Sequence, residues 1–412
     1  MTADGRPTLS RRALLVGGGL AGAGVAAAAA LPGTGGAAPV DGTATGTVPF
    51  HGTHQQGIAT PEQARLVFAS FDVTGDRTAL ADLLGAWTAA AERLTAGQSL
   101  PGVADGFAPP ADTGEALDLP ASRLTITVGY GPGLFDDRFG LAGRRPAALV
   151  ELPAFPGDAL DPARSGGDLC VQACADDPQV AFHAVHTLAR MALGTAALRW
   201  MQLGFGRTAA PGAGATTPRN LLGFKDGTDN LVTTDAGALA AHVWVDDRSD
   251  QAWMTGGSYL VARRIRTHVE AWDRSTLGDQ EATIGRVKTT GAPLGRRSER
   301  DPVELAAVDS SGVPRIPLDA HIRVAAPATN NGAALLRRGY SFADGVDPAT
   351  GELDCGLFFI CFQKDPTVQF IPIQQRLAHS DALSHYLLHT GSAVFACPPG
   401  TAPGRPWGYG LF

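Results

Sequence analysis

Cysteine is scarce in this chain and does not occur in the pairs that bind metals or cofactors. Only five cysteines occur in 412 residues, and the number is odd. Such a set is too small for the disulfide framework of a cysteine-rich secreted protein. The absence of any C-x-x-C or C-x-x-C-H motif argues against a zinc ribbon, a thioredoxin-like site and a covalently attached haem. We expect the five thiols to pack as small apolar side chains: Cys170, Cys174, Cys355, Cys361 and Cys397.

Positive charge is also in short supply. The chain has 33 lysines and arginines against 40 aspartates and glutamates, so its formal net charge at pH 7 is -7. A protein that neutralises a phosphate backbone needs a basic surface, and the charge balance therefore argues against nucleic acid as a partner. Hydrophobic residues make up 44% of the chain and charged residues 18%, which is a globular balance. The length allows two or three domains with a large core.

Long hydrophobic runs are missing too, except for one near the amino terminus. Arg11 and Arg12 stand directly before an apolar run over residues 13–31. This pattern is similar to a twin-arginine signal peptide, which directs the export of folded proteins. The alternative is a membrane anchor, because the run approaches the ~20 residues that cross a bilayer, although its Ala and Gly content makes it weakly hydrophobic. We expect a signal and a disordered segment over residues 1–47, cleavage between Ala30 and Ala38, and a secreted or extracytoplasmic protein.

Patterns of apolar residues predict two successive sets of secondary-structure elements. The first set is strand, helix, strand, strand, helix, strand, at residues 63–73, 77–94, 124–128, 168–175, 179–193 and 201–205. The second set has strands at 259–266, 321–325, 357–362 and 392–396, and helices at 269–272 and 374–389.

The two sets share a detail that indicates a duplicated unit. Leu169 and Leu357 each begin an apolar run that ends nine residues later in Asp-Pro. We predict an α+β protein of duplicated ferredoxin-like units with antiparallel sheets, and expect the facing sheets to leave a cleft for a ligand. The predicted boundaries are an amino-terminal unit over 48–207, a linker over 208–218 that is rich in Ala, Gly, Pro and Thr, and a carboxyl-terminal unit over 219–412.

Three polar residues have ordinary explanations when each is taken alone. Asp226 precedes Gly227, and an Asp-Gly pair is first of all a turn signal. His321 lies in a predicted strand, where a single histidine is more often structural than a ligand. Arg338 would by default be a solvated charge.

Together these residues carry a resemblance. A G-x-x-D-G motif at Gly223–Gly227, a His-Ile-Arg at 321–323 and an Arg-Gly at 338–339 resemble the dye-decolorising peroxidases. Further stretches are similar to that family at residues 49–61, 131–135, 166–169, 280–288 and 356–363, so the resemblance runs from about residue 49 to the carboxyl end. The pattern looks closest to the A-type branch, whose members often carry twin-arginine signals. The family's fold, a pair of ferredoxin-like units that bind haem, agrees with the element order.

The resemblance implies a site with one iron ligand and two catalytic residues. His321 would be the proximal ligand of one non-covalent haem b, which leaves the opposite position open for peroxide. Asp226 would move the proton between the peroxide oxygens, and Arg338 would stabilise the developing negative charge. Because neighbouring side chains of an extended segment point to opposite sides, only one of Arg337 and Arg338 can reach the iron, and the Arg-Gly-Tyr context favours Arg338.

Other residues would support the haem in a cleft of the carboxyl-terminal unit. Asp381 is our candidate for the carboxylate that orients the proximal histidine. Arg323 and Arg286 are candidates for binding the haem propionates, and Leu357 and Phe359 for the distal wall. Each of these four also fits ordinary packing or surface charge.

The implied function is a haem peroxidase that reduces hydrogen peroxide and oxidises dyes, phenolics or other one-electron donors through a ferryl intermediate. Its partners would be peroxide, a reducing substrate and the twin-arginine export machinery, while the oligomeric state cannot be read from the sequence. One alternative is a haem-binding or iron-acquisition protein of the deferrochelatase type, and another is a copper or other metal protein that uses His51 and His54. Electron transfer to large dyes could use any of several aromatic residues: Trp200, Trp253, Trp272, Tyr340, Tyr386 and Trp407.

Overall fold

The structure is a computed structural model that describes residues 46–102, 106–206 and 217–412. The described residues belong to one unit, Ala44–Phe412. Residues 1–45 of the predicted signal and disordered segment over 1–47, and residues 208–216 of the predicted linker over 208–218, lie outside the described residues. Within the described ranges, no helix is long and apolar enough to cross a membrane.

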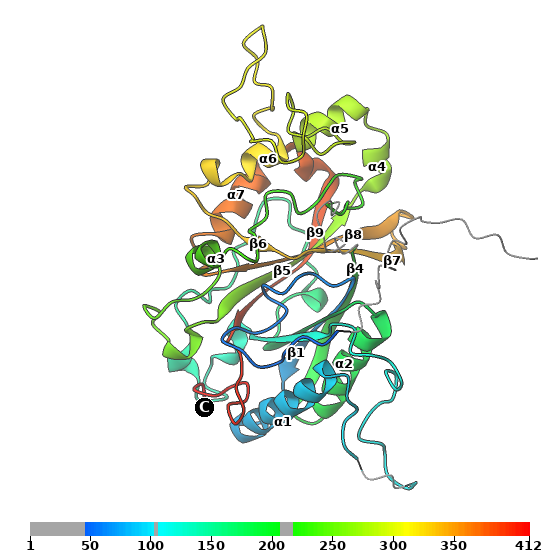
Figure 1. Ribbon diagram of the computed structural model, residues 1–412, viewed down its shortest axis with the longest axis vertical. Helices are drawn as coiled ribbons and strands as arrows, with labels where there is room; N and C mark the ends of the chain where they lie inside the picture. The colour runs from blue at the N-terminus through cyan, green and yellow to red at the C-terminus, as the bar shows by residue number, and fades with distance from the viewer. Residues whose placement is uncertain (1–45, 103–105, 207–216) are drawn as a thin grey trace, which may run out of the picture. The chain divides into compact units, whose positions relative to one another are not determined.

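The first half of the described chain has the element order that the sequence predicts (Figure 1). Each of its two helices begins at an aspartate whose carboxylate accepts backbone N–H groups, Asp76 for α1 and Asp177 for α2. Its strands pair antiparallel in the order β4-β1-β3-β2. The elements are β1 (Arg65–Val73), α1 (Arg77–Thr95), β2 (Thr125–Tyr130), β3 (Leu169–Ala175), α2 (Pro178–Met191) and β4 (Ala196–Phe205).

The second half has the corresponding strand order, β9-β5-β8-β7, but a longer excursion after its first strand. Its helices are α3 (Ala236–His242), α4 (Val269–Asp273), α5 (Leu277–Ile284), α6 (His321–Val324) and α7 (Phe370–Ser380). Its strands are β5 (Ser258–Thr267), β6 (Leu336–Arg337), β7 (Tyr340–Val346), β8 (Leu353–Gln363) and β9 (Leu387–Cys397).

Two predictions for this half are wrong in detail. The predicted strand at 321–325 is the short helix α6, and β7 is the strand that pairs with β8 in its place. The predicted helix at 374–389 is divided, because α7 ends at Ser380, a 3-10 turn covers Ala382–Tyr386, and β9 begins at Leu387.

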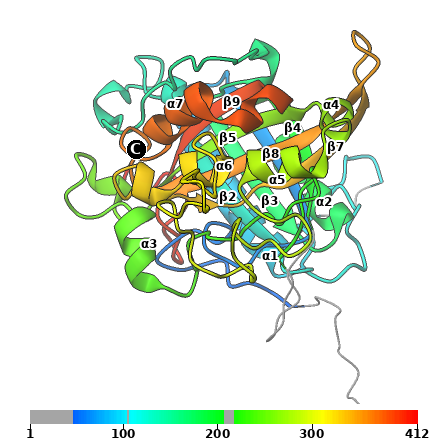
Figure 2. The same ribbon diagram turned by 90° about the horizontal axis from the view of Figure 1, so that it is seen from above.

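The two sheets join edge to edge into one closed ring of strands. β4 pairs with β7 through Phe205 and Ser341, and β2 pairs with β9 through Tyr130 and Ala396. The pairing of β5 with β8, which lie side by side in Figure 2, completes the ring. β6 is attached to β8.

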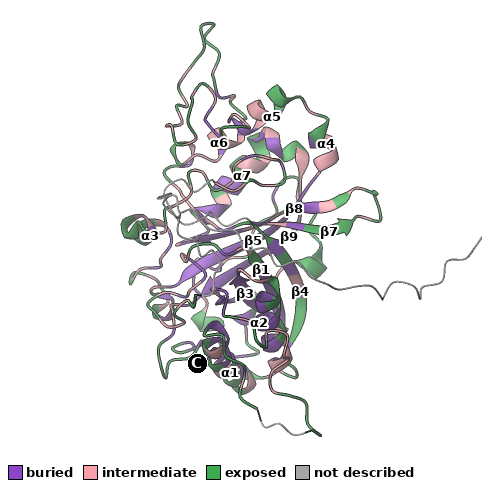
Figure 3. Ribbon diagram, turned by 45° about the vertical axis from the view of Figure 1, so that its right-hand side comes forward, coloured by how far each residue is buried: buried purple, intermediate pink, exposed green. Residues whose placement is uncertain are grey.

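Apolar side chains fill the space between the two sheets, and Figure 3 colours much of the central strands as buried. Phe68 of β1 contacts Phe358 of β8 and Phe395 of β9 at ring-centroid distances of 5.3 Å and 6.1 Å. The prediction of a ligand cleft between facing sheets is therefore wrong, because this space is a packed core. A site in the second half must use the outer face of its sheet, which α6 and α7 approach in Figure 1.

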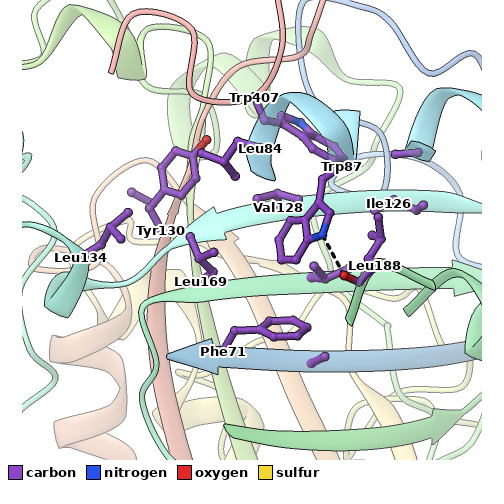
Figure 4. Close-up of a cluster of buried hydrophobic side chains, with 14 of the residues drawn as sticks. Phe71, Leu84, Trp87, Ile126, Val128, Tyr130, Leu134, Leu169, Leu188 and Trp407 are labelled. Atoms are coloured by element: carbon purple, nitrogen blue, oxygen red, sulfur yellow. Dashed lines mark hydrogen bonds between the residues drawn. The ribbon is translucent and has the colours of Figure 1, made fainter. Parts of the chain in front are cut away.

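A second core fills the space between the first sheet and its helices (Figure 4). Trp87 of α1 is fully buried there, and its Nε1 donates to the Leu188 carbonyl of α2 at 2.8 Å. All five cysteines are buried and free, which confirms that they pack as small apolar residues.

Candidate functional site

Asp226 lies on a tight hairpin that its glycines make possible. Arg219 pairs with Lys225, and the Asp226 N–H donates to the Pro218 carbonyl at 2.8 Å. Gly223 and Gly227 have φ values of 81° and 107°, which side chains other than glycine rarely adopt. The G-x-x-D-G motif is thus a backbone requirement that presents one aspartate.

The arginine beside Asp226 is Arg337. Its Nη1 lies 3.7 Å from Asp226 Oδ1, and its Nη2 donates to the Thr228 carbonyl at 2.9 Å. Asn230 fixes its backbone, since the Asn230 side chain donates to the Arg337 carbonyl at 2.8 Å and accepts from the Arg337 N–H at 2.9 Å. Arg337 therefore holds the hairpin and lies against the carboxylate.

Arg338 does not reach this position, which corrects our assignment of the distal arginine. Its side chain is 2% exposed and donates to the Thr60 carbonyl at 2.5 Å and to the side-chain oxygen of Gln63. The reason is strand alternation, because Leu336, Tyr340 and Phe342 are all buried in the core between the sheets and Arg338 shares their parity. Arg338 is an anchor for the segment before β1.

His321 is oriented by Asp381, as the sequence analysis expected. His321 Nδ1 donates to Asp381 Oδ2 at 2.6 Å, and the other Asp381 oxygen accepts the Leu383 N–H at 2.9 Å. Burial lowers the pKa of His321, but the charge of Asp381 and this hydrogen bond outweigh burial and raise it. Asp381 thus keeps a proton on Nδ1 and directs Nε2 away from itself.

Asp226 and Arg337 lie near His321, because the charges of both act on the pKa of this histidine. One third of each of the three side chains is accessible to solvent, 33% in every case. Burial also acts on the pKa of His321, although a third of its side chain is accessible. The three side chains therefore lie near one another in the second half.

Leu357 and Phe359 lie on the outer face of β8. They are half-buried and alternate with Phe358 and Ile360, which point into the core between the sheets. Arg337 pairs with Cys361 two residues further along, so its side chain projects from the same face. The apolar wall and the arginine thus belong to one surface.

The other two predicted cofactor ligands are engaged by protein groups. Arg323 donates four hydrogen bonds to the carbonyls of Leu305, Ile316 and Pro317. Arg286 donates to the carbonyls of Gly291 and Glu299 at 2.9 Å and 3.1 Å and pairs with Asp229. Both arginines brace the loop between α5 and α6 in this structure.

The proposed metal pair at the amino terminus is not supported. His51 contacts Thr401 and Glu92, whereas His54 contacts the Gly256 carbonyl and stacks on Trp244 with ring centroids 3.7 Å apart. In the described ranges, no group of three or more His, Cys, Asp or Glu residues is placed to hold a metal ion.

Most of the aromatic residues proposed as electron relays are buried. Tyr386 alone among the six is half-buried, and it packs against Trp272 with ring centroids 5.0 Å apart. Trp244, which was not among the six predicted residues, is also half-buried.

The residues around His321 fit a haem held by coordination. They provide an imidazole whose Nδ1 is already engaged, a partly accessible ring face, and apolar side chains on the neighbouring sheet. Among the described residues nothing donates a hydrogen bond to His321 Nε2, which leaves this nitrogen available to iron.

Comparison with known proteins agrees with this arrangement. The family model of the amino-terminal part of Dyp-type peroxidases matches residues 55–206, and that of the carboxyl-terminal part matches residues 217–402. The chain belongs to the Dyp-type peroxidase family. Members of this family bind haem, and membership of the family identifies the chain as a peroxidase.

Proteins named deferrochelatase and proteins named DtpA or DyP-type peroxidase are both similar to most of this Dyp-type chain. Deferrochelatases of Yersinia pestis and Escherichia coli K12 are 40% identical to it over 86% and 85% of this chain and 82% and 84% of their own length. Ferric DtpA from Streptomyces lividans is 41% identical, with a TM-score of 0.82 over 90% of this chain and 98% of its own. A DyP-type peroxidase from Cellulomonas bogoriensis is also 41% identical, with a TM-score of 0.81 over 90% and 99%.

Proposed function

We propose that the chain is a dye-decolorising haem peroxidase of the A-type branch, which reduces hydrogen peroxide and oxidises dyes, phenolics or other one-electron donors. The proposal is supported by the pair of Asp226 and Arg337 near His321 and by the hydrogen bond through which Asp381 orients this histidine. A haem carrier would need the histidine but neither Asp226 nor Arg337.

The residues divide the work by their chemistry. One haem b per chain, held through His321 Nε2 on the carboxyl-terminal ferredoxin-like unit, would take the oxidising equivalents of peroxide and pass them to the donor one electron at a time. Asp226 accepts the proton from one peroxide oxygen and returns it to the other. Arg337, which stays protonated, stabilises the negative charge on the departing oxygen. Leu357 and Phe359 limit water on this side.

The test is a visible spectrum of the purified protein with and without peroxide. We expect a Soret band that changes on addition of one equivalent of peroxide and returns when a phenolic donor is added, together with bleaching of an anthraquinone dye. The absence of a Soret band, or a Soret band that does not change on addition of peroxide, would refute the proposal. His321→Ala should lose the band or its response to peroxide.

A second candidate function is release of iron from haem, because curated relatives at 40% identity are named deferrochelatases. This activity would leave an intact metal-free porphyrin, whose red fluorescence distinguishes it from oxidative bleaching. Incubation of the haem-loaded protein under reducing conditions decides between the two, and we expect peroxide turnover without porphyrin release.

We also propose that the protein is exported by the twin-arginine machinery and works outside the cytoplasm. The support is Arg11-Arg12 before the weakly hydrophobic run over 13–31. Because this route carries folded proteins, haem would be loaded before export. Replacement of both arginines by lysine should retain the haem-loaded protein in the cytoplasm, and unchanged secretion would overturn the assignment.

A further inference from the structure

Glu299 connects the loop between α5 and α6 to the hairpin that carries Asp226. Its carboxylate accepts hydrogen bonds from Lys225 and Thr217 and from the Thr228 hydroxyl at 3.0 Å. Lys225 directly precedes Asp226, and Thr228 follows it by two residues. One carboxylate therefore holds the chain on both sides of the proposed proton-transfer residue.

The contact is a partly buried ion pair and not a surface one. The side chains of Lys225 and Glu299 are each 14% exposed. Burial raises the pKa of Glu299, but the hydrogen bonds from Lys225, Thr217 and Thr228 outweigh it, so the pKa is lowered and the carboxylate stays charged. Close packing surrounds the pair, since a Cβ on Gly291 would lie 2.6 Å from the Lys225 side chain.

Asp226 has no comparably strong contact of its own. Its carboxylate lies 3.4 Å from Asn220 Nδ2 and 3.7 Å from Arg337 Nη1, both long for hydrogen bonds. The position of this carboxylate therefore depends on its backbone, which the contacts of residues 225 and 228 fix. Arg219 adds to this fixation through its bonds to the Lys288 and Thr289 carbonyls at 2.6 Å and 2.8 Å.

We propose that Glu299 is a positioning residue of the peroxide site, which holds Asp226 toward His321 by clamping Lys225 and Thr228. The inference rests on the proposed function of Asp226. A general base must lie within hydrogen-bond reach of its proton, and a displacement of about 1 Å can lower a rate by about 100-fold. Glu299 thus contributes to peroxide reduction without touching peroxide.

Glu299→Ala is the direct test, and Glu304→Ala is its matched control. Glu304 lies in the same loop and pairs with Arg296, but its side chain is 53% exposed and makes no hydrogen bond or ion pair with the described residues of the hairpin. In stopped-flow mixing of the haem-loaded protein with peroxide, we expect the second-order rate constant to fall by about 10- to 100-fold in Glu299→Ala and to stay unchanged in Glu304→Ala. The Soret band before mixing and the KM for the phenolic donor should stay as in the parent.

A purely structural role would lower stability without this kinetic signature. Glu299→Gln keeps the side-chain shape and an oxygen that accepts from the two threonines, but it removes the ion pair with Lys225. It therefore tests the positioning role even if the alanine variant does not fold. We expect the rate constant of Glu299→Gln with peroxide to lie between those of the parent and of Glu299→Ala. A wild-type rate in Glu299→Gln, or in a folded Glu299→Ala, overturns the positioning role.

A double variant separates this inference from the proposed function itself. If Glu299 acts through Asp226, then Asp226→Ala/Glu299→Ala should react no more slowly than Asp226→Ala alone. Additive losses would show that Glu299 acts by another route. If Asp226→Ala alone keeps the parent rate, the role of Asp226 fails first, whatever Glu299 does.

Discussion

Arg337 and Arg338 point to opposite faces, so we expect Arg337→Met to lower the rate of reaction with peroxide and Arg338→Met to lower the stability of the protein. Methionine keeps an unbranched chain of similar length and removes the charge and the donors. Arg337 lies beside Asp226 with a third of its side chain accessible, whereas Arg338 is buried against Thr60 and Gln63.

The magnitudes follow from these contacts. Loss of one fixed donor at a developing negative charge costs about 2.7 to 4 kcal/mol of transition-state stabilisation, so Arg337→Met should slow the reaction with peroxide by about 100- to 1,000-fold. Arg338→Met leaves the buried Gln63 oxygen and the partly buried Thr60 carbonyl unpaired at about 1 to 3 kcal/mol each, so it should lower the free energy of unfolding by about 2 to 6 kcal/mol. The folded Arg338 variant should react with peroxide at close to the parent rate.

Two measurements on the haem-loaded variants decide the matter. Stopped-flow absorbance gives the rate constant with peroxide, and guanidinium denaturation gives the free energy of unfolding. The reasoning is refuted if Arg338→Met loses more than tenfold in rate while Arg337→Met reacts normally.

Three further predictions concern carboxylates. Asp381→Asn keeps the turn-capping oxygen but weakens the bond to His321, the proposed iron ligand, so titration of apoprotein with haem should show about 10- to 100-fold weaker binding. Asp235→Asn, which caps α3, should bind haem normally. Asp158→Ala leaves Arg263, which is 1% exposed, without its carboxylate, so chemical denaturation should show a free energy of unfolding lower by about 3 to 5 kcal/mol. The control Asp72→Ala, which breaks an exposed pair, should lower it by at most about 1 kcal/mol. Equal losses in the two variants would contradict the burial argument. Despite some burial, hydrogen bonds from Thr113, His183 and His186 lower the pKa of Glu115 from 4.5 to about 2. Because this folded-state pKa is depressed, the stability advantage over Glu115→Gln should be full above about pH 5 and disappear as pH falls toward 2, and an advantage independent of pH would count against it.

The strand and helix order of the first half could be predicted from the sequence because its elements carry strong local patterns. Apolar alternation and helical spacing, with Asp76 and Asp177 as caps, agree with the structure there. The second half was harder, since His321-Ile-Arg-Val alternates like a strand over too few residues to exclude one turn of helix. Its helical state depends on contacts with α7 that are distant in sequence.

The sequence carried enough information to predict which of the two arginines lies beside Asp226. Leu336, Tyr340 and Phe342 are apolar at even positions, and this parity alone predicts that Arg338 points into the core and Arg337 away from it. The family-like context outweighed that signal in our prediction. Glu299 and Asn230 had no local signal, because their partners lie about 70 and 107 residues away and only the folded chain brings them together.

In the closed ring of strands, each half of the chain covers strand edges and an apolar face of the other half. β4 meets β7, and β2 meets β9, so a half expressed alone would present open strand edges and the apolar face that now lies between the sheets. Such a fragment should aggregate, whatever its own helix and strand content. Because the two halves cover each other, the intact chain should unfold as one unit, as the export of an already folded protein that we propose would require.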